Sequence, residues 1–65
     1  MKLNKQKLEI AMARAKFNRD ELAEKAELPK TTVYSAYGRC YCRPATAGKI
    51  AEALDVDVTE ILEDE

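Results

Sequence analysis

NRDELAEKAELPKTTVYSAYG, residues 18–38, holds two short helical patterns separated by one proline. Asn18 and Glu21 have the spacing of a capping box, in which each side chain accepts a hydrogen bond from the other residue's backbone N–H. Phe17 before this cap and Leu22 after it can close as a hydrophobic staple. These signals predict a helix from Arg19 to about Glu27.

Pro29 marks the start of the next helix. Proline is tolerated in a first helical turn because its missing N–H would be unpaired there. It also disfavours helical dihedrals at the preceding Leu28, which predicts a sharp turn between the helices. The next helix is therefore predicted over about Pro29–Tyr37, with Gly38 as a left-handed stop.

The remainder of the chain is also predicted to be helical. Asn4 can cap a first helix, and Asp57 with Glu60 repeats the capping-box spacing. Gly48 is expected to permit close approach of a neighbouring helix. The other predicted helices are about Asn4–Lys16, Ala45–Leu54 and Val58–Leu62, with a loop over Arg39–Pro44. We therefore expect one compact, all-α domain of five helices over residues 1–65.

Two helices that cross at a steep angle need a small residue at the crossing, and Ala23 is placed to supply it. Val33 is the apolar anchor of the Pro29–Tyr37 helix, which leaves the rest of that helix free to face outward. The outward side chains are polar and mildly basic: Lys30, Thr31, Thr32, Tyr34 and Ser35. Such a face suits the DNA major groove, which admits one α-helix.

Other predicted contacts are to the DNA backbone. Asn18 and Arg19 stand at the amino end of a helix, where free amides and the helix dipole favour a phosphate. Arg39 and Arg43 flank the following loop and can hold backbone phosphates. The alternatives are an ordinary solvated helix face and arginines that serve solubility only.

Charge is distributed unevenly, although the net charge is only −1. Residues 1–49 contain all eleven Lys and Arg against five acids, whereas residues 50–65 contain seven acids and no base. This asymmetry indicates a basic functional face followed by an acidic end. The chain shows neither a signal peptide nor an apolar membrane span, so a cytoplasmic location is expected.

No enzyme, metal site or cofactor is predicted. The chain has no histidine, no glycine-rich phosphate loop and no nucleophile beside a base. Cys40 and Cys42 are too close in sequence for an unstrained disulfide and too few for a zinc site, so they are expected to be reduced thiols. A redox-sensing regulator stays open as an alternative, because the positive charges of Arg39 and Arg43 near Cys40 can favour the reactive thiolate form of its side chain.

The segment 18–38 resembles the helix-turn-helix motif of the phage Cro and repressor family, especially in ELAEKA (Glu21–Ala26). The similarity continues through Arg43-Pro44, through GKIAEALDV (48–56) and into Thr59–Leu62, so it covers nearly the whole chain. It implies a five-helix, lambda-repressor-like DNA-binding domain of phage or bacterial type. The function it implies is sequence-specific transcriptional regulation on double-stranded DNA. No small-molecule ligand is inferred from the sequence.

The resemblance also implies roles for individual residues. Arg19 corresponds to a residue that contacts the DNA backbone, Arg43 matches a loop that touches phosphate, and Lys30, Thr31 and Ser35 match positions that contact bases. The family usually acts as a dimer on a paired operator; here a weak homodimer, or a dimer formed on DNA, is expected.

Two positions depart from the family pattern. Glu27 replaces the usual glycine of the turn, and Asp55 replaces a glycine after the fourth helix. Aspartate adopts left-handed geometry better than most residues. Glu27 and the low net charge keep a second reading open, namely a protein–protein interaction module that keeps the fold without binding DNA.

Overall fold

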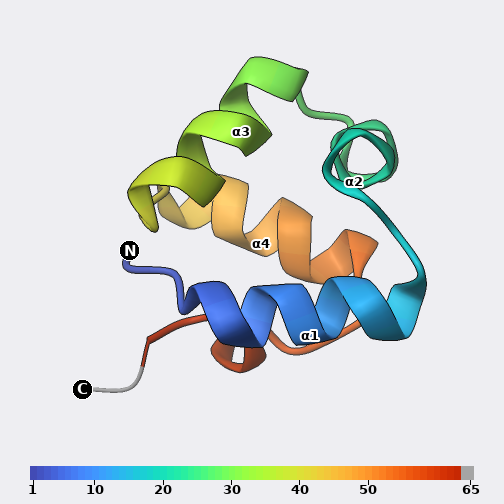
Figure 1. Ribbon diagram of the computed structural model, residues 1–65. Helices are drawn as coiled ribbons and strands as arrows, with labels where there is room; N and C mark the ends of the chain where they lie inside the picture. Colours follow the sequence, from blue (N-terminus) through green and yellow to red (C-terminus); the bar gives the residue numbers. More distant parts are fainter. Residues whose placement is uncertain (64–65) are drawn as a thin grey trace.

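The computed structural model describes residues 1–63, which form four α-helices and one short 3-10 turn. Helix α2 packs against both α3 and α4, while η1 packs against α1 and α4. Figure 1 shows α3 and α2 on one side of the molecule and α1 with η1 on the other. The predicted all-helical fold is confirmed. The elements are α1 (Lys5–Ala15), α2 (Arg19–Ala26), α3 (Lys30–Arg39), α4 (Pro44–Ala53) and η1 (Val58–Glu60).

The three predicted side-chain caps are all present. Asn4 accepts a hydrogen bond from the Lys7 N–H at 3.0 Å. Asn18 accepts from the backbone N–H of Glu21 at 2.8 Å, and the Glu21 carboxylate accepts from the N–H of Asn18 at 3.0 Å. The capping box of Asp57 likewise forms at the start of η1. Each cap satisfies amides that the helix itself leaves unpaired.

One hydrophobic core receives side chains from every element and from the residues next to η1. Its largest fully buried side chains are Leu8, Leu22, Val33, Ile50 and Ile61, each at most 2% exposed. Full burial of one such side chain stabilises the fold by about 1.5–3 kcal/mol. The core thus holds α3 on α2 and α2 on α4, and it fixes the direction in which α3 presents its outer face.

The expected fifth helix over Val58–Leu62 is wrong, because only the 3-10 turn η1 forms there. Ile61, directly after η1, is fully buried. The backbone then pairs with the start of the chain: the Glu63 N–H donates to the Lys2 carbonyl at 3.0 Å, and Leu62 forms an antiparallel bridge with Leu3. This pairing requires extended backbone after Ile61, which ends the helical turn.

The end of α3 also differs from the expectation, because the helix continues through Gly38 to Arg39. Cys40 takes the left-handed conformation instead, with φ 55°. Its carbonyl accepts from the Leu3 N–H at 2.8 Å, and the Cys42 N–H donates to the Met1 carbonyl at 3.0 Å. The first residues of the chain therefore lie between the loop after α3 and residues 61–63, and this pairing determines where α3 ends.

Two further expectations about glycine positions have opposite outcomes. Gly48 was expected to permit close helix packing, but a Cβ added there would meet nothing within 4 Å, so that interpretation is wrong. Ala47 and Ala51 are the buried small residues of α4. Asp55 has φ 56°, which confirms that it adopts the left-handed conformation in place of glycine. No helix in the described part of the chain could cross a membrane.

Candidate nucleic-acid interface

The turn between α2 and α3 fixes the geometry of the site. Glu27 ends α2 in the left-handed conformation, with φ 57° and ψ 41°. The Leu28 N–H then donates to the Ala23 carbonyl at 2.9 Å. Glu27 therefore adopts the backbone usually provided by glycine, at a cost of about 1–2 kcal/mol. Ala23 is 1% exposed and Val33 is 2% exposed, as expected for the helix crossing and its anchor.

The outer face of α3 has the predicted character. Lys30, Thr31, Tyr34 and Ser35 are exposed, and Thr32 is half-buried. The buried residues of this helix are Val33 and Ala36. These two anchors hold the opposite side of α3 against the core, so its polar side projects as one ridge.

Part of the predicted site surrounds a shallow hollow of about 370 Å³ between α3 and the start of α4. Arg39 and Arg43 are exposed and line this hollow from two sides of the loop. No side chain caps the amino end of α4, and the Arg43 residue itself occupies its N-cap position. Two guanidinium groups beside an uncapped helix end make this hollow attractive to an anion. Its lining comprises Thr31, Thr32, Ser35, Ala36, Arg39, Tyr41, Cys42, Arg43 and Thr46.

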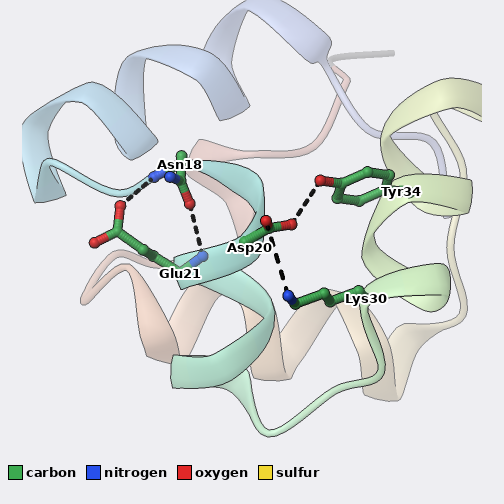
Figure 2. A network of polar contacts seen from close by, with 5 residues as sticks. All are labelled: Asn18, Asp20, Glu21, Lys30 and Tyr34. Atoms are coloured by element: carbon green, nitrogen blue, oxygen red, sulfur yellow. Dashed lines mark hydrogen bonds and ion pairs between the residues drawn. The ribbon is translucent and has the colours of Figure 1, made fainter.

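The other predicted contact residues form a second group at the junction of α2 and α3. The Tyr34 hydroxyl donates to Asp20 Oδ1 at 2.5 Å, and Lys30 Nζ lies 3.8 Å from Asp20 Oδ2. Figure 2 shows both side chains of α3 directed toward this one carboxylate of α2. The hydrogen bond to Asp20 raises the pKa of Tyr34 above its usual value.

Arg19 joins this second group through aromatic rings. Its guanidinium carbon lies 4.6 Å from the centroid of the Tyr37 ring and 5.5 Å from that of Tyr34. The Tyr37 hydroxyl donates to Glu9 Oε1 at 2.6 Å, which raises the pKa of Tyr37. Arg19 is exposed, so its guanidinium is both held in place by the rings and accessible to a phosphate.

Asn18 already forms two hydrogen bonds within the protein. Its side-chain oxygen and its backbone N–H both belong to the capping box with Glu21. Figure 2 shows this pair at the amino end of α2. Asn18 therefore shapes the helix end beside Arg19, and a phosphate at this end would meet the remaining first-turn amides.

Sequence reasoning missed two residues at this surface, Asp20 and Thr46. Asp20 is fourteen positions from Tyr34, and no local pattern indicates that the two side chains meet. Tyr41 and Thr46 line the hollow next to the arginines. Tyr41 lies inside the predicted Arg39–Pro44 loop, and its aromatic ring was a possible contact to the DNA backbone from the sequence alone.

The cysteines and acids add little chemistry to the site. Cys40 donates weakly to the Tyr37 carbonyl at 3.7 Å, and burial raises the pKa of the Cys42 thiol, so this thiol is poorly reactive. No three metal-ligating side chains gather among residues 1–63. The predicted acidic end includes Asp64 and Glu65, which lie outside the described residues.

Comparison with known proteins gives two matches. A family model described as the Cro/C1-type HTH DNA-binding domain matches residues 7–65. A solved structure of a hydroxyethylphosphonate dioxygenase variant is similar over 98% of this chain, with 30% sequence identity and a TM-score of 0.82. That similarity spans 14% of the dioxygenase chain, so it concerns one small part of that protein. No curated protein sequence matches the chain.

Proposed function

The chain belongs to the Cro/C1-type helix-turn-helix DNA-binding domain family, and from this premise we propose that it is a sequence-specific transcriptional regulator that inserts α3 into the major groove. In this function, residues 1–65 act as one non-enzymatic domain of phage or mobile-element type in the cytoplasm. The observation that carries it is the polar outer face of α3, which adjoins a hollow lined by Arg39 and Arg43.

The two parts of this surface have different roles in the proposal. Lys30, Thr31 and Ser35 contact base edges, because amine and hydroxyl groups can pair with donors and acceptors in the major groove. Thr32 and Tyr34 flank them on the same helix and support contacts to the base edges or the backbone. These contacts give the protein its sequence preference.

The remaining residues hold the backbone. Arg39 and Arg43 bind one phosphate position through the hollow, while Arg19 and the helix end capped by Asn18 bind another. Phosphate contacts fix the register of the protein on the duplex without specifying sequence. Because two backbone contacts lie on either side of α3, they would orient the helix in the groove.

Selection from a random-sequence duplex library tests this division of roles. We expect one recovered motif, and Ser35→Ala should weaken binding to it by about 1–3 kcal/mol while relaxing the preference at one position. Arg43→Ala should weaken binding to all sequences and lower the salt slope by about 1. Arg14→Gln removes the same charge from α1, on the side of η1, and serves as the control.

Failure to enrich any sequence, with no duplex binding at low salt, would refute the DNA-binding proposal. The protein–protein interaction module would then be the better account, and Ile10, which is 48% exposed on α1, would be a first place to look. A weak homodimer, or a dimer formed on DNA, is part of the proposal. Sedimentation equilibrium with and without the selected duplex would distinguish these states.

A further inference from the structure

Asp20 places a carboxylate beside the surface that we propose contacts DNA, although DNA is itself negatively charged. It lies in the first turn of α2 and is half-buried, and its carboxylate forms a hydrogen bond and an ion pair with side chains of α3. One carboxylate oxygen accepts from the Tyr34 hydroxyl at 2.5 Å, and the other lies 3.8 Å from Lys30 Nζ (Figure 2). Both partners belong to the face that we propose contacts DNA.

The ion pair with Lys30 is weak enough to be exchanged. The side chains of Lys30 and Asp20 are 68% and 48% exposed, and exposed pairs of this kind contribute little to stability. A correctly placed base acceptor can therefore replace Asp20 as the partner of Lys30. Until that happens, the carboxylate neutralises this lysine in the free protein.

Tyr34 is held more firmly than Lys30. Asp20 accepts from its hydroxyl, while the Arg19 guanidinium lies 5.5 Å from the centroid of its ring. Because the carboxylate accepts from this hydroxyl, it raises the pKa of Tyr34. The ring therefore keeps one direction on the outer face of α3.

We propose that Asp20 is a specificity-determining residue, which competes with DNA phosphates for Lys30 and fixes the direction of Tyr34. On arbitrary sequence, phosphates do not displace the carboxylate, and the complex lacks one cationic contact. On the preferred sequence, a correctly placed base acceptor replaces Asp20 at Lys30. The inference rests on the proposed DNA-binding function and adds a discriminating residue to it.

Asp20→Asn tests the competition, because asparagine keeps an acceptor for Tyr34 and loses the charge that holds Lys30. Binding of a random-sequence duplex is measured from about 50 to about 200 mM salt. One added phosphate contact steepens the log–log salt slope by about 0.9. The variant should therefore bind more tightly than the parent, with an advantage about 3.5-fold larger at the lowest salt than at the highest.

Two controls separate this effect from general charge. Glu24→Gln removes the same charge one turn further along α2, where no ion pair or side-chain hydrogen bond involves Glu24 in the described part of the chain. The Glu24→Gln variant should show the same salt dependence of DNA binding as the parent protein. The change caused by Asp20→Asn should also vanish when Lys30→Ala is present. An unchanged slope for Asp20→Asn, or an equal change for Glu24→Gln, would overturn the inference.

The outcomes also distinguish this inference from the proposed function. A parent protein that binds no duplex at any salt concentration would refute the function and the role of Asp20 with it. A parent that binds while Asp20→Asn leaves the slope unchanged would refute only the role of Asp20. The positioning of Tyr34 is tested separately by spectroscopic titration. Asp20→Ala should lower the pH at which Tyr34 ionises, and an unchanged titration would contradict the claim that Asp20 fixes the direction of Tyr34.

Discussion

Glu27→Gly is expected to stabilise the protein, although it introduces glycine next to a helix. Glu27 has φ 57° and ψ 41°, and its side chain is exposed. A non-glycine residue in this conformation costs about 1–2 kcal/mol. Glycine avoids this cost, but it loses more backbone freedom on folding, which offsets about 0.4–1 kcal/mol. At the middle of both ranges, the net gain from relieved backbone strain is about 0.8 kcal/mol.

The charge of Glu27 must be separated from its backbone conformation. A carboxylate at the carboxyl end of α2 is unfavourable for the helix dipole, so its removal alone also stabilises the protein. Glu27→Gln removes the charge but keeps a non-glycine residue in the left-handed conformation. Its stability is therefore the reference for Glu27→Gly. Glu24→Gly makes the same change inside α2, where glycine should destabilise by about 0.5–1 kcal/mol.

Thermal and urea unfolding followed by circular dichroism measure these differences. A change of 1 kcal/mol shifts the Tm of a domain this small by about 4–8 °C. Glu27→Gly should therefore unfold about 3–6 °C above Glu27→Gln. If Glu27→Gly is no more stable than Glu27→Gln, the assignment of backbone strain to this turn is wrong.

The other predictions concern the cap, the core and the tyrosines. Asn18→Ala removes the acceptor for the Glu21 N–H and should lower the free energy of unfolding by about 0.5–2 kcal/mol in urea titrations; no loss would contradict the role of the capping box. Leu22→Ala empties a fully buried position and should cost about 2–5 kcal/mol, a large part of the total stability of so small a domain. The hydrogen bonds that raise the pKa of Tyr34 and Tyr37 stabilise the folded state while the pH is below about 10, the pKa of tyrosine in the unfolded chain. This contribution should be lost as pH rises through the folded pKa values, and ultraviolet titration showing both phenols ionising at or below that unfolded value would refute it.

Local signals in the sequence were sufficient to predict how the helices begin. Asn4, Asn18 and Asp57 each cap a helical segment because their partners lie within three residues. The left-handed conformation of Asp55 was also predictable, since it depends on the intrinsic preference of aspartate. The outer face of α3 followed from the position of Val33, which occupies the buried side together with Ala36.

Contacts between distant segments could not be predicted in this way. Leu3 pairs with the loop at Cys40, so α3 ends later than Gly38 suggests. Similarly, Leu62 is drawn into a bridge with Leu3, and the expected last helix is reduced to η1. The hydrogen bond between Asp20 and Tyr34 also depends on how α2 and α3 pack, which explains why Asp20 was missed.

The most direct test of the DNA-binding surface is an amide NMR titration with a generic DNA duplex at low salt, followed by addition of salt. The proposed interface predicts shifts that cluster on residues 18–19, 29–35 and 39–43 and that revert as salt releases the phosphate contacts. Spectra that do not change, or shifts confined to the acidic residues after 50, would contradict the proposal that this protein binds DNA through α3.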